Sequence, residues 1–349
     1  MSGPVEFSCP LPLEVKDRVV LGHGSGGKLS AELLRDVFLP SFRSPILNQL
    51  DDQAVLEING ARLAFTTDSF VVKPLFFRGG DIGSLAVDGT VNDLAMGGAT
   101  PLYLSAGFIV EEGLEIDALR RVAESMGRAA EAIPIEIVAG DTKVVEKGSG
   151  DGLFINTTGI GLVPEGVRLS PTLVRSGDRV LLSGPIGDHG IAILAEREGI
   201  QFATELASDS APLHGLVAAM LAAADGIRAL RDPTRGGVSS ALNEIAARAQ
   251  VGITIEETAI PVREEVRGAC EMLGLDPLYV ANEGKLVAFV AADAADAVLE
   301  AMRRHPLARE AAIIGTVTGT HPGLVLLRTP FGTTRIVDVL PGDQLPRIC

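Results

Sequence analysis

Acidic side chains recur beside small residues and at the ends of apolar stretches, where strands and helices are expected to turn. These places are Asp51-Asp52, Thr67-Asp68, Asn92-Asp93, Gly140-Asp141 and Asp232. Hard divalent cations take several carboxylate oxygens, often together with phosphate oxygens, so these residues are candidates for a shared metal site. Each one alone is more readily explained as a helix cap or a turn residue. Asp93 differs because it lies inside an apolar helical stretch, which favours a metal ligand.

A glycine-rich segment, Gly22–Lys28, lies between an apolar stretch and a sequence with helical spacing. Its spacing is close to that of a P-loop, but Leu29 stands where a P-loop needs serine or threonine to hold magnesium. Successive small residues expose backbone N–H groups, and the lysine adds a positive charge, which suits phosphate. An ordinary glycine turn is the alternative. The candidate phosphate-binding residues are Gly24, Gly26, Gly27 and Lys28.

Two further charged residues lie beside apolar strands. Lys143 follows Asp141-Thr142 within an apolar stretch, where it could place a point charge on an anion or simply reach solvent. Glu283 lies in Asn-Glu-Gly-Lys just before another apolar stretch. A glutamate held against an apolar strand can have a raised pKa and act as a base, although the four residues could also form only a turn.

The chain ends in a cysteine, Cys349, after Pro346-Arg-Ile. A terminal cysteine is a poor core residue and a good nucleophile or carrier, because a thiolate must be accessible to react. It does not stand four residues from the end, so it is not a prenylation signal. The other cysteines, Cys9 and Cys270, are far apart, and no C-x-x-C occurs, so neither a zinc site nor a disulfide framework is indicated.

The elements that position these residues belong to a chain of 349 residues, 46% of them hydrophobic, with a net charge of −15. This length predicts two domains, and this composition supports a sizeable core. The acidic balance argues against nucleic acid as a partner. No apolar run reaches the ~18 residues of a membrane span, and Met1–Lys16 lacks the pattern of a signal peptide, so we expect no membrane contact and a cytoplasmic location.

Periodicity predicts alternating strands and helices. Asn59-Gly60 between two apolar runs is the strongest short signal for a hairpin. We expect strands at 54–58, 62–72, 102–110, 135–145, 153–163, 179–182, 253–256, 285–291 and 311–317. We expect helices at 29–39, 82–96, 115–133, 187–198, 212–224, 238–249, 262–273 and 294–304.

A stretch rich in proline and glycine, Pro164–Asp178, separates two halves with a similar order of strands and helices. We therefore expect a glycine-rich N-terminal segment at 1–42, a first domain at 43–164, and a second α/β domain at 165–329. The last stretch, 330–349, contains three prolines and is expected to be an extended, mobile tail that carries Cys349.

The order of these motifs resembles the HypE family of hydrogenase maturation factors, over nearly the whole chain from Leu21. Each motif is weak alone, but their order together with the terminal cysteine is highly specific. The motifs are His23–Lys28, Thr66–Asp68, Val91–Gly97, Gly140–Lys143, Asp232–Gly237, Asn282–Lys285 and Pro346–Cys349. The wider superfamily includes aminoimidazole ribonucleotide synthetase, selenide water dikinase and thiamine-phosphate kinase.

The resemblance implies an α+β, two-domain chain with the aminoimidazole ribonucleotide synthetase fold. Its N-terminal domains would pair into a homodimer through a shared β-barrel, followed by a sandwich-like C-terminal α/β domain. ATP and Mg²⁺ would bind in a cleft built from aspartates and the glycine-rich segment. The implied nucleotide-binding residues are Gly24, Gly26, Gly27, Lys28, Asp68, Asn92, Asp141 and Thr142. The implied metal ligands are Asp51 or Asp52, with Asp68, Asp93 and Asp232.

The resemblance also implies the chemistry. In this family a carbamoyl group, delivered by the carbamoyltransferase HypF, is carried on the C-terminal cysteine, here Cys349. ATP activates the carboxamide oxygen, and loss of phosphate leaves a thiocyanate, whose cyano group goes to iron held by a HypC–HypD complex. Family likeness makes Glu283 the base and Lys143 the charge near phosphate, although these roles could be exchanged.

Two other functions compete with this interpretation. A relative such as selenide water dikinase has a cysteine or selenocysteine before the lysine of its glycine-rich segment, and His23–Lys28 has none. A non-catalytic scaffold with a vestigial nucleotide cleft would not need to keep Lys143, Glu283 and the aspartates.

Overall fold

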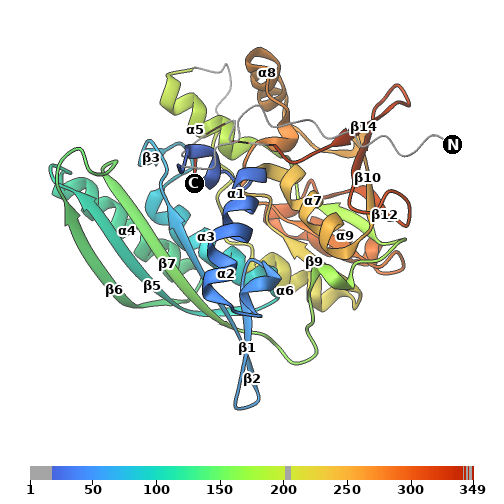
Figure 1. Ribbon diagram of the computed structural model, residues 1–349, viewed down its shortest axis with the longest axis horizontal. Helices are drawn as coiled ribbons and strands as arrows, with labels where there is room; N and C mark the ends of the chain where they lie inside the picture. Colours follow the sequence, from blue (N-terminus) through green and yellow to red (C-terminus); the bar gives the residue numbers. More distant parts are fainter. Residues whose placement is uncertain (1–17, 201–205, 341, 343–344, 346–347) are drawn as a thin grey trace.

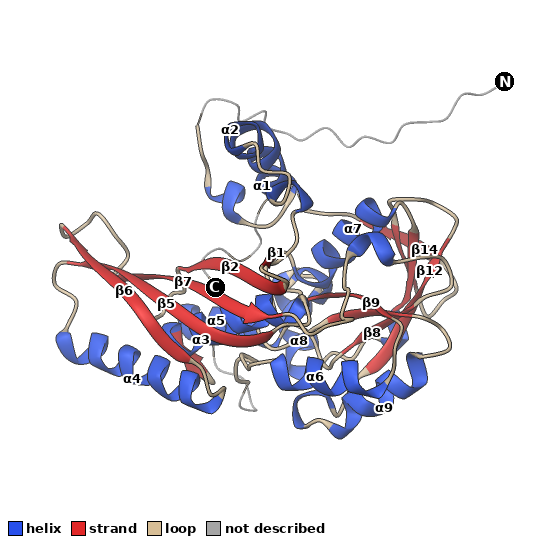
Figure 2. Ribbon diagram, turned by 90° about the horizontal axis from the view of Figure 1, so that it is seen from below, coloured by secondary structure: helices blue, strands red, loops and turns tan. Residues whose placement is uncertain are grey.

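The computed structural model describes residues 18–200, 206–340, 342, 345 and 348–349 (Figure 1). The expectation for Met1–Lys16 and the thiol of Cys9 fall outside these ranges. The described chain contains two larger sheets, each with its own helices (Figure 2). No helix in the described ranges combines the length and apolar character that crossing a bilayer requires.

The first sheet has the order β1-β2-β7-β5-β6. Its strands are β1 (Ala54–Ile58), β2 (Ala61–Phe70), β5 (Thr100–Glu111), β6 (Glu136–Val145) and β7 (Leu153–Leu162). The predicted hairpin joins β1 to β2, and Asn59 and Gly60 both have positive φ angles, 51° and 83°. Two successive residues of this kind define the turn whose twist matches that of the flanking strands.

Two helices cover one face of this sheet. In α4 (Ile116–Ala132), Val122, Met126 and Ala130 recur every fourth residue and are buried, so one stripe of the helix faces the core. Helix α3 (Ile82–Met96) is buried on nearly all sides, because it packs on β2 and β7 and also contacts α4, α6 and β9. Asp81 caps α3 by accepting hydrogen bonds from the N–H groups of Gly83 and Ser84. Helix α3 therefore links the first sheet to the second half of the chain.

The second sheet has the order β14-β13-β10-β12-β8-β11-β9. Its strands are β8 (Arg179–Leu182), β9 (Ile227–Arg231), β10 (Gly252–Glu256), β11 (Val287–Val290), β12 (Ala312–Thr318), β13 (Val325–Arg328) and β14 (Thr334–Val337). Its helices are α5 (Asp188–Glu198), α6 (His214–Ala223), α7 (Gly237–Ala249), α8 (Glu264–Leu273) and α9 (Ala295–Arg304). Strand β11 shows the layering: Val287 and Phe289 pack with residues of α7, whereas Ala288 and Val290 pack with residues of α6 and α9. The sheet thus lies between two layers of helices.

Short elements precede and connect the sheets. The helix expected at 29–39 is present as α1 (Lys28–Leu33), a π-helical stretch η2 (Leu34–Phe38) and α2 (Leu39–Phe42). This arm stands apart from the sheets in Figure 2. The small hairpin of β3 (Phe76–Phe77) and β4 (Gly80–Asp81) leads into α3. Single turns of 3₁₀ helix lie at 21–24, 47–49, 171–173, 257–259, 277–279 and 306–308.

The C-terminal segment differs from the expected mobile tail. Residues Thr334–Val337 form β14, which pairs with β13. Val337 is fully buried in the same hydrophobic cluster as Val287 and Phe289 of β11. Farther on, the side chains of Leu345 and Ile348 are each only 6% exposed. They belong to a hydrophobic cluster that also contains Val280, Ala281 and apolar residues of α3 and α4, called here the first hydrophobic cluster. The apolar side chains of Val337, Leu345 and Ile348 supply this packing, so the described part of this segment is docked.

Candidate active site

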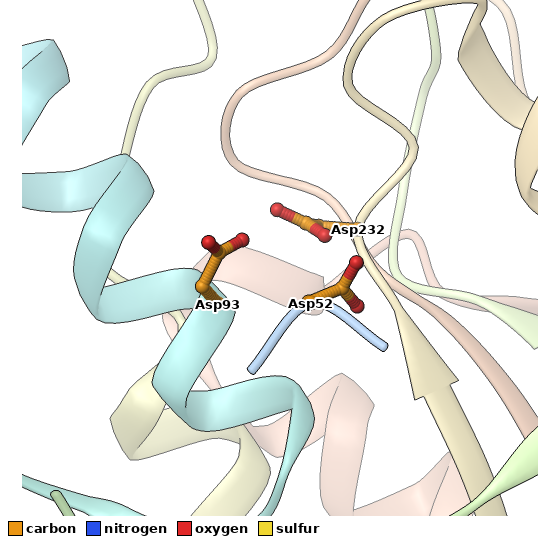
Figure 3. Close-up of side chains that lie close together, drawn as sticks. All are labelled: Asp52, Asp93 and Asp232. Carbon is orange, nitrogen blue, oxygen red and sulfur yellow. The ribbon is translucent and has the colours of Figure 1, made fainter. Parts of the chain in front are cut away.

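Three aspartates from distant parts of the sequence converge between the two halves of the chain (Figure 3). Asp52 precedes β1, Asp93 lies on α3 and Asp232 follows β9. Carboxylate oxygens of all three lie within 4.8 Å of one another. Hard cations such as Mg²⁺ favour such oxygen ligands, so the donor set fits a divalent cation.

The raised pKa values of the aspartates show that this group would bind a cation favourably. Burial raises the pKa of Asp93 well above its ordinary value, and the neighbouring charges of Asp232, Asp68 and Asp52 raise it further. Burial also raises the pKa of Asp232, to about 6. Like charges held this close in a buried site cannot all ionise without a counter-charge. Thr66 is one neutral donor here, since its Oγ1 lies 2.7 Å from Asp93 Oδ2.

Arg231, the last residue of β9, braces one side of the group. Its Nη1 lies 2.6 Å from Asp52 Oδ1, and its other terminal nitrogen pairs with Glu244 on α7. Asp51 points to a different cation, with its Oδ1 3.7 Å from Arg248 Nη2. Of the two adjacent candidates, Asp52 therefore joins the three-aspartate group, while Asp51 lies at its margin.

A cavity of about 640 Å³ opens beside the three aspartates. Its walls include Gly26 and Gly27 from the glycine-rich segment, Asp68 from β2, Glu283 and the terminal Cys349. Burial raises the pKa of Asp68, and this is partly offset by Arg235, whose Nη2 lies 3.9 Å from Asp68 Oδ1. The cavity thus places backbone N–H groups, carboxylates and a thiol around one space.

The backbone N–H of Glu283 is fixed by a hydrogen bond, whereas one oxygen of its carboxylate has no partner among the described residues. Its N–H donates to Asp209 Oδ1 at 3.0 Å, and Asp209 Oδ2 lies 3.0 Å from Lys285 Nζ in a buried ion pair. Glu283 Oε1 is buried and accepts no hydrogen bond from the described residues. Burial raises the pKa of Glu283 well above its ordinary value, with additional contributions from Asp68 and Asp232. A carboxylate with a raised pKa is a stronger base once it is ionised, which suits a role in proton transfer.

The terminal cysteine reaches the same space. Val71 donates its N–H to the Cys349 carbonyl oxygen at 3.2 Å, and His189 Nε2 lies 2.5 Å from the Ile348 carbonyl oxygen. Arg235 shares a smaller adjoining cavity with Cys349, and the negative charge of Cys349 raises the pKa of this guanidinium. The chain end therefore lines a cavity together with a cation, Arg235, and the buried Glu283.

The glycine-rich segment is fixed by close backbone contacts. Gly26 has a φ of 73°, and an added Cβ at Gly27 would lie 2.4 Å from the Leu340 carbonyl oxygen. An added Cβ at Gly24 would meet nothing within 4 Å. Lys28 does not line the larger cavity, and its Nζ lies 2.7 Å from Asp338 Oδ2. The glycines approach the site, whereas the lysine pairs with the C-terminal segment.

Besides Gly24 and Lys28, four more of the expected site residues do not line the larger cavity of one chain. Asp141, Thr142 and Lys143 lie on β6, the edge strand, where Lys143 Nζ is 3.0 Å from Asp141 Oδ2 and both side chains are 70% exposed. Asn92 is buried, and its amide donates to the Ala211 and Glu283 carbonyl oxygens. Asn92 therefore holds the Glu283 loop instead of facing the cavity.

Sequence reasoning overlooked two arginines and a histidine. Arg231 and Arg235 flank Asp232 in Arg-Asp-Pro-Thr-Arg-Gly-Gly, where positive charges beside a candidate metal ligand were the available signal. His189 lies in Gly187-Asp-His-Gly, and nothing in that context indicated its contact with the chain end.

Comparison with known proteins identifies the family of the chain. The family model for the AIR synthase related protein N-terminal domain matches residues 50–163, and that for the C-terminal domain matches residues 175–326. Carbamoyl dehydratase HypE of Azotobacter vinelandii is 58% identical over 331 residues, which cover 95% of this chain and 97% of that protein. The chain belongs to the HypE family of carbamoyl dehydratases.

Two solved HypE structures have the same fold. A HypE–HypF complex contains a chain 49% identical to this one, with a TM-score of 0.84, covering 88% of this chain and 99% of that one. A hydrogenase maturation protein HypE in complex with ATP is also 49% identical, with a TM-score of 0.81 and coverage of 95% and 100%. The HypE resemblance seen in the sequence motifs is thereby confirmed, as is a two-domain AIR synthase-related fold with mixed α and β structure.

Proposed function

We propose that this chain is an ATP-dependent carbamoyl dehydratase that converts an S-carboxamide on its own Cys349 into a thiocyanate, the source of a cyanide ligand for [NiFe]-hydrogenase iron. The observation that carries the proposal is the position of Cys349. The last residue of the chain lines the acidic cavity together with Glu283, whose buried carboxyl has an oxygen without a hydrogen-bond donor among the described residues. The name carbamoyl dehydratase given to relatives at 58% and 55% identity supports it.

The larger cavity is the proposed ATP site. Gly26 and Gly27 offer backbone N–H groups to the phosphates, and ATP bound to a HypE of 49% identity supports this assignment. Asp52, Asp93 and Asp232 would hold Mg²⁺, with Asp68 beside them and Asp51 at the margin. When bound, Mg²⁺ supplies charge neutralisation for the phosphates and for these carboxylates.

The reaction proceeds in two balanced steps. In the first, the carboxamide oxygen of S-carboxamido-Cys349 takes the γ-phosphoryl group of ATP, ADP leaves, and the nitrogen gives up one proton. In the second, the carbon–oxygen bond breaks, phosphate leaves with the bonding pair, and the nitrogen loses its second proton to form the C≡N bond. The sum is loss of water from the carboxamide coupled to formation of ADP and phosphate.

The residues around Cys349 suit these steps. Glu283 takes the nitrogen proton, because its buried carboxyl is fixed through Asp209 and is directed to the cavity that holds Cys349. Arg235 shares both cavities with Cys349 and offers positive charge to the developing phosphate.

The role of Lys143 requires a second copy of the chain. Strand β6 is an edge with Val138 58% and Val144 69% exposed, and long apolar edges favour pairing with another chain. Phe65, Tyr103 and Ile160 lie together on the neighbouring strands and are also exposed. We propose a homodimer in which two such sheets close a shared barrel. Lys143, with Asp141 and Thr142, would then reach the phosphates in the partner subunit.

HypF is the proposed carbamoyl donor, as supported by a solved HypE–HypF complex with a chain of 49% identity. A HypC–HypD complex is the proposed acceptor of the cyano group. A reactive terminal thiol needs a reducing compartment, so the proposed location is the cytoplasm.

The test is the intact mass of the chain after reaction with HypF, carbamoyl phosphate and ATP, followed by a second incubation with ATP and Mg²⁺. Wild type should gain one carbamoyl group and then lose the mass of one water, and Cys349→Ala should show neither change. Cys270→Ala is the matched control, because Cys270 is a buried thiol on α8. Carbamoylation of the Cys349→Ala chain would overturn the proposal.

A further inference from the structure

The chain end is held in its docked position by a small number of specific contacts. The side chains of Leu345 and Ile348 pack in the first hydrophobic cluster with Val280 and Ala281. Both of the last carbonyl groups accept hydrogen bonds, the one of Cys349 from Val71 N–H and the one of Ile348 from His189 Nε2. Apolar burial gives affinity without direction, whereas these two bonds fix where the terminal peptide plane points.

His189 is built for this contact. It lies in the first turn of α5 and is fully buried, with its ring edge-on to Phe77 at 5.8 Å between centroids. A carbonyl oxygen can only accept, so Nε2 carries the proton and donates to Ile348. In the neutral ring Nδ1 must then accept, and the Ser208 hydroxyl lies 2.8 Å from it. Burial lowers the pKa of His189, which agrees with this neutral form.

The same loop reaches Glu283. Ser208 Oγ also accepts the Ser210 N–H at 3.1 Å, which fixes the turn around Asp209. Asp209 in turn accepts the backbone N–H of Glu283 at 3.0 Å. A short chain of hydrogen bonds therefore joins the Ile348 carbonyl, through His189 and the 208–210 turn, to the backbone that positions Glu283.

We propose that His189 is a positioning residue that latches the docked chain end and sets Cys349 and Glu283 in register with each other. It touches neither the thiol nor the carboxyl directly. The inference rests on the proposed function for its consequence in catalysis, but docking itself is a property of the unmodified chain. When the latch is released, the terminal residues leave the cavity and become available to a transferring partner.

Carboxypeptidase removal of Cys349 from the full, unmodified chain, followed by intact mass, measures docking without ATP or a carbamoyl group. A protease that cuts the open form reports its population when opening and closing are fast. His189→Asn should release Cys349 about fivefold faster, the factor expected for one lost hydrogen bond of ordinary net strength. His189→Gln, whose amide nitrogen can reach the position of Nε2, should stay near the wild-type rate.

Two variants keep the test informative. His214→Asn at the start of α6 is the matched histidine control and should leave the rate unchanged. Ser208→Ala removes the hydroxyl that orients the ring, so it should accelerate release even if His189→Asn fails to fold. Wild-type rates in both His189→Asn and Ser208→Ala would overturn the latch, and so would equal acceleration by the Asn and Gln variants.

A second readout separates the latch from the carrier chemistry. In chains already carrying the carbamoyl group, His189→Asn should slow single-turnover dehydration about fivefold while loading by HypF is undiminished. If Cys349 is not the carrier, dehydration fails in every variant but the carboxypeptidase result still stands. Loading and dehydration lowered equally would contradict a positioning role.

Discussion

Replacing Asp232 by Asn should stabilise the chain in the absence of divalent cations. Asp232 is almost fully buried and shares its site with Asp52 and Asp93. Asparagine has nearly the same shape but cannot ionise, so the substitution removes one charge from a crowded group. The acidic group should therefore cost stability in the metal-free chain, and this cost is what a bound cation would offset.

The magnitude follows from the pKa of Asp232, which burial raises from 3.8 to about 6. The unfolded chain loses this proton first as pH rises, so the ionised aspartate progressively destabilises the folded state between about pH 4 and pH 6. At 1.36 kcal/mol for each unit of pKa, the full cost above pH 6 is about 3 kcal/mol. This pKa already includes the opposing attraction of Arg231. A buried asparagine amide that lacks a hydrogen-bond partner costs about 1–2 kcal/mol, so we expect a net gain of about 1–2 kcal/mol.

The assay is urea unfolding with a chelator present, at pH 4 and pH 7.5, for wild type, Asp232→Asn and the exposed control Asp117→Asn. The stabilisation should appear at pH 7.5 and vanish at pH 4, and the control should change by less than about 0.5 kcal/mol. Adding Mg²⁺ should stabilise wild type more than Asp232→Asn. A variant less stable than wild type at pH 7.5, or an equal response to Mg²⁺, would refute the reasoning.

Three further predictions concern catalysis and the glycine-rich segment. Glu283→Gln should slow single-turnover dehydration by about 10²–10⁴-fold while carbamoyl loading followed by mass is unchanged, and equal loss of both steps would argue against a base. Lys143→Ala should lower the dehydration rate, whereas Lys147→Ala, in the exposed connection that follows β6, should not. Mixed dimers of Lys143→Ala with Glu283→Gln should recover activity if the lysine acts across the dimer, and no recovery would place it elsewhere. Gly27→Ala should lower the thermal midpoint and ATP affinity, because its Cβ would meet a carbonyl oxygen at 2.4 Å, and Gly24→Ala should match wild type in both.

Local signals in the sequence predicted most of the elements. The Asn59-Gly60 turn and the regular burial period of α4 are set by residues close together in sequence, and both are present where expected. Strand β9 was missed because its short sequence, with arginines at the second and last positions, has a weak pattern, and its burial comes from α3 and β11. Strand β14 was missed because nearby prolines and glycines suggested a tail.

The site was predictable only in part, and the reason is again physical. Asp93 stood out as an acid within an apolar helix, and it lies in the three-aspartate group. Asn92 shows the opposite case. It is adjacent to Asp93 on the same helix, but its side chain points to a different side, where its amide binds backbone groups. Lys143 lies on an edge strand whose surroundings depend on assembly, which a single sequence does not encode locally.

The central claim is that Cys349 carries the group that is dehydrated, and the nitrile stretch in the infrared spectrum tests it most directly. Wild-type chain loaded with isotope-labelled carbamoyl phosphate should develop a thiocyanate band only after ATP and Mg²⁺ are added, at a frequency shifted by the label. Peptide mapping should place the nitrile on Cys349, and Cys349→Ala should give no band. A chain that is demonstrably carbamoylated at Cys349 but yields no nitrile with ATP and Mg²⁺ would contradict the account.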